Sequence, residues 1–306
     1  MAEDATPRPS RPVQAEALEA IVRRMARAEA APWLHGEVAQ RMAERLPLIR
    51  VQPQRLLDWW SFQGGGAEAL RQAYPAARQL QVEHEAAAER RRAAKPPRRW
   101  WPLRQPAATP SWQLAREVQP GDADLLWANM VLHLRPDPLQ QLREWHRALA
   151  VDGFLMFSTL GPGSLSALRQ LYARQGWPSP HAAFVDMHDL GDMLVQAGFA
   201  DPVMDQEQLT LTWPDADALL GELRSLGGNA DSGRASGLRT PRWRRRLGEA
   251  LEALRGADGR LRLEFEVVYG HAWRVAPKPR VAAQTAVGLD EMRAMVRAGR
   301  RGPGSA

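Results

Sequence analysis

The sequence predicts an α/β protein in which a mostly parallel central sheet has helices on both faces and an antiparallel strand at its edge. Two observations carry this prediction. Short apolar runs alternate with segments of helical periodicity through the middle of the chain. Repeated strand–helix units of this kind favour a parallel sheet. Residues 208–213 and 260–273 instead alternate between apolar and polar side chains, as half-exposed antiparallel strands do.

The individual elements follow from local patterns. In the first part of the chain we expect helices at about 15–30 and 36–46, a strand at 55–60, a helix at 66–73, a strand at 78–83, a helix at 85–93 and a short strand within 112–118. In the second part we expect buried strands at 123–132 and 152–161, a helix starting at Asp137, and a helix at 190–198 that ends at a glycine.

Composition divides the chain into an arm, a domain and a tail. Residues 1–14 are rich in proline and charge and are expected to be a disordered arm. Residues 15–276 are expected to form the folded domain, with an insert at 94–111 that is rich in proline, arginine and tryptophan. Residues 277–306 are expected to be a flexible tail. We expect the two adjacent tryptophans of the insert to pack against the domain, with a lid over a ligand as the alternative.

Composition also excludes several functions. The 306 residues include no cysteine, which excludes disulfides, thiolate metal sites and cysteine nucleophiles. No apolar run reaches the roughly 18 residues that a membrane span needs, and the first residues lack the apolar core of a signal peptide. We therefore expect a cytoplasmic protein with no metal site and no membrane partner.

The net charge of +6 is carried almost entirely by arginine, with dense clusters such as 90–92 and 242–246. Because acids alternate with arginines along most of the chain, solvated faces are the expected role, and nucleic acid is not the expected partner. Docking of an acidic macromolecule is one alternative, since clustered arginines attract anionic partners. Binding of nucleic acid through the arginines and tryptophans is a second.

Parallel strands bring their carboxyl ends to one edge of a sheet, where ligands of such folds bind. Asp58 ends the first expected strand, and the glycines that follow it let the backbone approach a ligand closely. Glu83 ends the second strand, 25 residues later, where an acid can hold a ribose through its two hydroxyls. A solvated acid at a helix start is the alternative for Glu83. Asn129 and His133 follow the central strand at the same edge.

Several stretches resemble known enzymes. LPLIRVQPQRLLDWW and AYPAARQLQVEHE are similar to the start of class I S-adenosylmethionine-dependent methyltransferases. The blocks DADLLWANMVLHLRPDPLQQLREWHRALAVDGFLMFSTLGPGSLSALR and FVDMHDLGDMLVQAGFADPVMDQEQLTLTW resemble the malonyl-acyl-carrier-protein O-methyltransferases of biotin synthesis, as do LLGELRSLGGNA and EFEVVYGHAWR. This resemblance covers residues 33–274.

The resemblance implies a Rossmann-like class I methyltransferase fold. It also implies methyl transfer from S-adenosylmethionine to the free carboxylate of a malonyl thioester on acyl carrier protein. The positions implied for the cofactor are Asp58, Gly64, Gly65, Glu83 and Asn129, and the candidates for the substrate are His133, His188 and Arg224. A carboxylate is already ionised at neutral pH, so no catalytic base is required and we identify none. An acidic carrier protein would be received by arginines such as those at 242–246.

The chain departs from the family at the glycine turn after the first strand. Members usually carry Asp-x-Gly-x-Gly-x-Gly, whereas DWWSFQG places Trp60 and Phe62 at the first two glycine positions. Large rings there would lie where the methionine end of the cofactor passes the backbone. Two hypotheses follow. In one, the run 64–66 cradles the cofactor and the enzyme is active; in the other, cofactor binding is lost and the chain is a degenerate relative that binds a carrier protein or another subunit.

Overall fold

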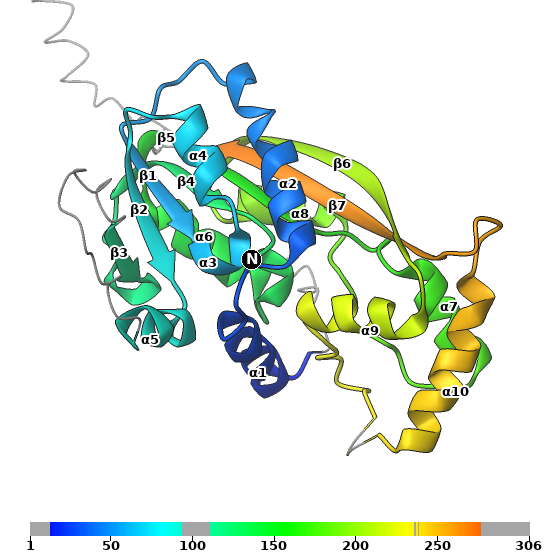
Figure 1. The fold of residues 1–306 in the computed structure, drawn as a ribbon. Coiled ribbons are helices and arrows are strands. Elements are labelled where there is room, and N and C mark those ends of the chain that lie inside the picture. The colour runs from blue at the N-terminus through cyan, green and yellow to red at the C-terminus, as the bar shows by residue number, and fades with distance from the viewer. Residues whose placement is uncertain (1–12, 94–110, 236, 238, 277–306) are drawn as a thin grey trace, which may run out of the picture. The chain divides into compact units, whose positions relative to one another are not determined.

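The computed structural model describes residues 13–93, 111–235, 237 and 239–276, and contains a seven-stranded sheet (Figure 1). The strand order is β3-β2-β1-β4-β5-β7-β6. The first five of these strands are parallel, and β7 runs antiparallel to both β5 and β6. The strands are β1 (Arg55–Trp59), β2 (Arg78–Glu83), β3 (Ser111–Leu114), β4 (Ala123–Ala128), β5 (Leu149–Leu160), β6 (Ala200–Trp213) and β7 (Leu261–Trp273). The predicted mostly parallel sheet with an antiparallel edge is confirmed.

Helices cover both faces of this sheet because each central strand buries its residues in alternation on two sides. In β1, Leu57 and Trp59 belong to one core cluster and Leu56 to the other. The helices are α1 (Ala15–Ala26), α2 (Trp33–Ala43), α3 (Ser61–Gly64), α4 (Ala67–Ala73), α5 (Glu85–Ala93), α6 (Pro138–Ala148), α7 (Ser166–Arg174), α8 (Met187–Gln196), α9 (Ala216–Ser225) and α10 (Pro241–Leu251). Helices α1, α6 and α8 pack in the first cluster, and α2, α4, α7, α9 and α10 in the second.

Short 3-10 turns complete the described elements, at Leu46–Leu48, Ala115–Glu117, Leu132–Leu134 and Glu252–Leu254. Local chemistry fixes several helix starts. The Asp137 carboxylate accepts a hydrogen bond from Gln140 N at 2.9 Å, and Pro138 occupies the first helical position of α6. Thr240 and Pro241 start α10 in the same way. The sequence interpretation contains no helix at α7, α9 or α10.

Two strands differ in length from their predictions. The strand expected over 123–132 ends at Ala128, because Met130 turns the backbone with a positive φ of 55°. β5 begins at Leu149, before the predicted start of the strand at residue 152. Asp152 there takes a φ of 64°, and the register with β4 shifts across it, from Ala123–Leu149 to Leu125–Phe154.

Several expectations fall outside the described residues. They concern the arm up to residue 12, the insert over 94–110 with its two tryptophans, and the tail from 277 onward. At the inner end of the arm, Val13 bridges to Asp231 and Gln14 N donates to Ala230 O at 2.8 Å. Among the described residues, no helix has both the length and the apolar character for crossing a membrane.

Candidate functional site

The carboxyl ends of β1, β2 and β4 meet at one edge of the sheet, here called the rim. Asp58 lies in β1 and is buried. Its Oδ2 accepts a hydrogen bond from Ser61 Oγ at 2.5 Å, which ties the strand to the first turn of α3. Burial raises the pKa of Asp58 to about 6, despite this hydrogen bond. The rim therefore contains a carboxylate that is held away from water.

The turn after β1 has the backbone shape that favours glycine. Trp60 adopts a left-handed conformation with φ 54° and ψ 50°, and Gly65 at the end of α3 has a φ of 67°. Such a conformation costs a bulky residue about 1–2 kcal/mol. Trp60, at the first substituted position, therefore has a strained backbone, whereas Phe62 is not among the residues with positive φ.

The side chain of Trp60 lies between the ends of β2 and β4. Its ring meets the ring of His84, which follows β2, edge to face at 5.2 Å. The guanidinium of Arg135, which follows β4, lies 5.5 Å from the ring centre. Only 2% of Trp60 is exposed, and it belongs to the core cluster that also contains residues of α1. The ring is thus buried against residues that follow β2 and β4. Phe62 packs instead on alanines of α1 and α5.

Glu83 ends β2 and is fully buried. Its Oε1 lies 2.6 Å from Arg91 Nη2, and its Oε2 accepts a long hydrogen bond of 3.4 Å from Phe62 N. Arg91 comes from α5 and also donates to Gln81 Oε1 at 2.6 Å. Burial raises the pKa of Glu83 to about 7; Arg91 opposes that shift and the nearby Asp58 adds to it. Two mutually repelling carboxylates therefore share one arginine at the rim.

Asn129 connects three segments at the rim. Its amide nitrogen donates to Gly64 O at 2.5 Å and to His35 O at 2.7 Å, and its amide oxygen accepts from Ser158 Oγ at 2.6 Å. It thereby joins the glycine run, the start of α2 and β5. The glycines fit closely here, because a Cβ at Gly66 would lie 2.6 Å from Trp127 Nε1.

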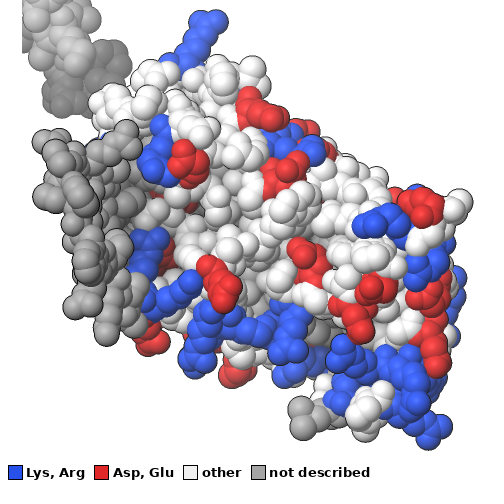
Figure 2. All heavy atoms as spheres, in the orientation of Figure 1, with Lys and Arg blue, Asp and Glu red and all other residues white. Residues whose placement is uncertain are grey.

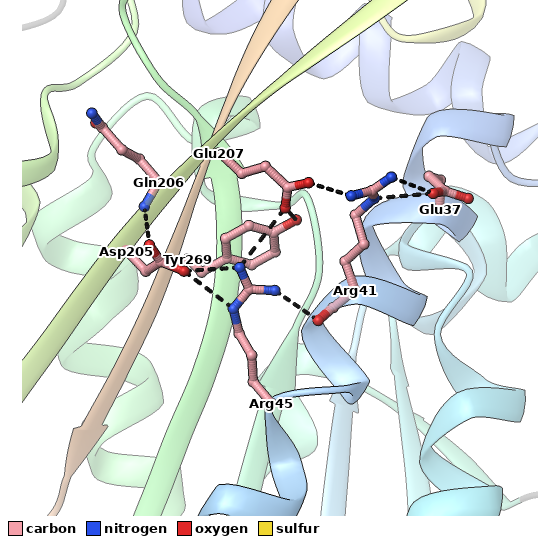
Figure 3. Close-up of polar contacts among 7 residues, drawn as sticks. All are labelled: Glu37, Arg41, Arg45, Asp205, Gln206, Glu207 and Tyr269. Atoms are coloured by element: carbon pink, nitrogen blue, oxygen red, sulfur yellow. Dashed lines mark hydrogen bonds and ion pairs between the residues drawn. The ribbon is translucent and has the colours of Figure 1, made fainter.

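Helix α2 is held over the sheet by a second set of polar contacts (Figure 3). Arg45 Nη2 lies 2.8 Å from Asp205 Oδ2 of β6, and its guanidinium stacks 3.9 Å over the ring of Tyr269 in β7. Arg41 pairs with Glu207, which also accepts a hydrogen bond of 3.2 Å from the Tyr269 hydroxyl. These contacts fix the end of α2 against the antiparallel edge, while its start contacts the rim.

Histidines and one phenylalanine pack beside the rim. His133 meets His35 edge to face at 6.5 Å and Phe184 at 6.1 Å, and His181 stacks on Phe184 at 5.0 Å. His133 Nδ1 also lies 3.4 Å from Thr159 Oγ1. Burial lowers the pKa of His35 to about 4 and lowers that of His181, so both imidazoles are neutral at pH 7.

The turn at 161–164 follows β5 and contacts a carboxylate of β7. Gly163 N donates to Glu266 Oε2 at 3.2 Å. A Cβ at Gly161 would lie 2.0 Å from Glu266 Oε1. Glycine is needed at this turn because the Glu266 side chain passes across it.

The structure brings most of the predicted site residues together. Asp58, Gly64, Gly65, Glu83, Asn129 and His133 lie at the rim and are linked by the contacts above. His188 is instead exposed in the first turn of α8, with its Nδ1 2.9 Å from Asp186 Oδ1. Arg224 lies at the exposed end of α9, beside Tyr172 and Trp243. The sequence interpretation missed His35, Ser61 and Arg91. Ser61, three residues after Asp58, is the one with a local signal.

The strand order, with five parallel strands and a reversed strand next to the edge, defines a Rossmann-like class I methyltransferase fold. Sequence comparison identifies the family. The malonyl-[acyl-carrier protein] O-methyltransferase of Gallionella capsiferriformans is 41% identical over 256 residues, which is 82% of this chain and 87% of that protein. The enzyme of the same name from Laribacter hongkongensis is 41% identical over 81% of this chain and 84% of its own length. The chain belongs to the malonyl-acyl-carrier-protein O-methyltransferase family.

Other comparisons give weaker likenesses. A relative of the same name from Halorhodospira halophila is 36% identical over 82% of this chain and 85% of its own length. A solved structure of a putative methyltransferase from Bacillus halodurans has a TM-score of 0.48 and 13% identity, over 77% of this chain and 99% of that one. No model of a known protein family matches the chain.

Proposed function

We propose that this chain transfers a methyl group from S-adenosylmethionine to the free carboxylate of a malonyl thioester on acyl carrier protein. Its relatives are named malonyl-[acyl-carrier protein] O-methyltransferases. The observation that carries the proposal to this chain is the pair of buried carboxylates at the rim. Burial raises the pKa values of Asp58 and Glu83 to about 6 and about 7, so both would be stabilised by a cationic ligand. The sulfonium of the donor is such a cation.

The residue types at the rim fit this donor. Glu83 has the position from which an acid binds ribose hydroxyls, and Gly64–Gly66 allow backbone to approach the ligand. Within the described residues, Asp58 Oδ1, His35 Nε2 and both polar side-chain atoms of Gln63 are buried without a hydrogen-bond partner. Buried polar atoms without partners are costly, and a polar ligand would satisfy them. One residue opposes the fit: Trp60 must move for the donor to enter.

When bound, the donor supplies a methyl group activated by its positive sulfur. The chain's own residues then have to position a nucleophile that is already ionised. We assign the malonyl carboxylate to the side of the rim formed by His133, His35 and His181. The last two are neutral, and each donates its Nδ1 hydrogen to a backbone carbonyl, to Gln63 O and to Ala182 O respectively, so neither forms an ion pair that would weaken the nucleophile. The buried surroundings exclude water from the reacting atoms.

A second candidate function is a catalytically degenerate family member that binds the carrier protein without methylating its cargo. The observation that favours it is that Trp60 is buried at the rim and Arg91 already pairs with Glu83. Titration calorimetry with S-adenosylmethionine separates the two candidates. Saturable heat, together with transfer of a labelled methyl group to malonyl-acyl carrier protein, supports the methyltransferase. Absence of heat at about millimolar donor would mean a binding free energy weaker than about 4 kcal/mol, and it supports the degenerate relative.

A further inference from the structure

Six exposed arginines form a continuous basic surface, visible as the blue area at the lower right of Figure 2. One lies in α9, four lie in α10, and one directly precedes Thr240, the N-cap of α10. The members of this basic surface are Arg224, Arg239, Arg242, Arg244, Arg245 and Arg246. An ion pair of 2.9 Å joins Arg244 to Asp217, and both side chains are largely exposed. Exposed pairs of this kind are weak and exchange partners readily. Most of the positive charge is therefore available to a partner.

The basic surface lies on the same side of the fold as the rim. Helix α7 follows the carboxyl end of β5, and α10 packs against both α7 and α9. Helix α10 leads into the start of β7. Leu160, the last residue of β5, pairs with Val267, so the first residues of β7, from Leu261 onward, extend past the carboxyl end of β5. A partner bound to these arginines would lie on the side of the sheet where the parallel strands end.

This surface contains a hollow of about 460 Å³ that is lined by residues of α7, α9 and α10. Leu220, Leu247 and Tyr172 contribute apolar walls, and Arg224 and Arg239 stand at its margin. An apolar hollow with guanidinium groups around it suits a protein surface that combines carboxylates with apolar side chains. Arg224, expected from the sequence to contact the substrate, lies here instead of at the rim.

Aromatic rings hold two of the arginines in place. The guanidinium of Arg239 lies 4.3 Å over Trp243, and that of Arg246 lies 5.7 Å from the centre of Trp177. The two tryptophans contact each other at 5.7 Å, and Trp177 contacts Tyr172 at 5.2 Å. Such contacts order a guanidinium before a partner arrives, which reduces the entropy lost on binding.

The same packing argues against nucleic acid. Binding of single strands requires exposed ring faces on which bases stack, whereas these rings are covered by arginines and by one another. A neighbouring hollow of about 550 Å³ also contains Asp215, Glu249 and Glu252 beside Arg245. These carboxylates would repel any anionic partner, so they border the basic surface and do not belong to it.

We propose that the basic surface is the docking site of the carrier protein, which it recognises by the acidic face of that protein. The inference rests on the proposed function for the identity of the partner. Docking at α9 and α10 delivers the thioester from the side of the sheet on which the rim lies. Charge complementarity at such a site speeds encounter and makes binding sensitive to salt.

The test measures binding of fluorescently labelled holo-acyl carrier protein to the unaltered chain and to Arg242→Glu/Arg245→Glu. Neither residue contacts the rim. We expect the variant to bind at least about tenfold more weakly, and affinity for the unaltered chain to fall steeply with salt. The matched control is Arg143→Glu/Arg147→Glu on α6, where two exposed arginines also stand on one helix. Arg242→Gln/Arg245→Gln, with circular dichroism, serves as a milder variant should the charge reversal unfold α10.

The outcomes separate this inference from the function on which it rests. A loss of carrier binding in the α10 variant alone supports the docking site, and methylation of a small malonyl thioester should then be unchanged. Equal affinity of the unaltered chain and the α10 variant overturns the docking site even where methyl transfer proceeds. Carrier binding that depends on α10, without methyl transfer to any malonyl thioester, retains the docking site and rejects the methyltransferase. Tight, salt-sensitive binding of single-stranded DNA with none of the carrier protein overturns the inference.

Discussion

Arg91 Nη2 lies 2.6 Å from Oε1 of Glu83, so the carboxylate placed to bind the donor already has a cationic partner from α5. Glu83 is fully buried, and an unpaired charge there would be expensive. The arginine therefore stabilises the folded chain in the absence of a ligand. It also competes with any ligand that needs the same carboxylate.

The first prediction concerns Arg91→Met. Removing the guanidinium leaves the buried carboxylate unpaired, so the variant should unfold at a lower temperature at pH 8. Because Glu83 is then free, S-adenosylmethionine should raise the melting temperature of the variant by more than it raises that of the unaltered chain. Thermal denaturation with and without donor measures both effects. Arg92→Met, at the next and exposed position of α5, is the matched control. An equal donor effect in all three proteins would show that Arg91 does not compete.

The second prediction concerns pH. The pKa of Glu83 is about 7 in the folded chain against 4.5 for a free glutamate. The folded state therefore binds a proton more tightly, and the chain gains stability as pH falls from about 7 toward about 4.5. Asp58, with a pKa of about 6, acts in the same direction.

Glu83→Gln should remove the larger part of this dependence. At about 1.4 kcal/mol per pKa unit, the free energy of unfolding gained between about pH 7 and about pH 4.5 should be a few kcal/mol smaller in the variant than in the unaltered chain. Urea denaturation at a series of pH values measures the free energy of unfolding directly. Glu249→Gln, at an exposed position of α10, should leave the dependence unchanged. A Glu83→Gln curve parallel to that of the unaltered chain would contradict the assignment.

The third prediction concerns the altered glycine turn. Trp60→Gly relieves a left-handed backbone that costs about 1–2 kcal/mol, but empties the space of a buried indole, which costs about 3–5 kcal/mol. The variant should therefore be less stable and should bind S-adenosylmethionine more tightly than the unaltered chain. Phe62→Gly should change donor affinity less, since Phe62 has no positive φ to relieve and packs on alanines of α1 and α5. Calorimetry on both variants tests this, and unchanged affinity at Trp60→Gly would mean that binding is limited elsewhere.

The sheet could be predicted from the sequence because its central strands bury both faces. Leu125 and Leu126 face opposite clusters, so β4 has to be apolar throughout and is visible as a run. Of the missed helices, α7 lies between β5 and α8 in the chain, and α9 and α10 lie between the antiparallel strands β6 and β7. The residues of α10 that are buried include Leu247 and Leu251, and its other face is mostly arginine, so the segment resembled a charged surface loop.

The rim could be predicted only in part, for a related reason. Asp58, Glu83 and Asn129 each stand at the end of a strand, and topology alone brings strand ends together. Arg91 and His35 are on helices, and their positions depend on how each helix is rotated against the sheet. The positive φ of Trp60 could be anticipated from the glycine that the family has there. The direction of its ring could not, because that depends on its contacts with His84 and Arg135, which follow other strands.

The last prediction concerns Asn129, which joins the glycine run, α2 and β5 by three hydrogen bonds. Asn129→Ala leaves two carbonyl groups without their donor, and each buried unsatisfied group costs about 1–3 kcal/mol. Asn129→Asp should be at least as harmful, because a carboxylate cannot donate to Gly64 O or His35 O. We therefore expect both variants to lose stability, and the amides at the start of α2 and in the glycine run to exchange hydrogen faster. Hydrogen exchange by mass spectrometry measures this locally. The amides at the other end of α2, near Arg45, serve as an internal reference. Uniform acceleration over the whole of α2 would mean that Asn129 supports the fold in general and does not specifically close the rim.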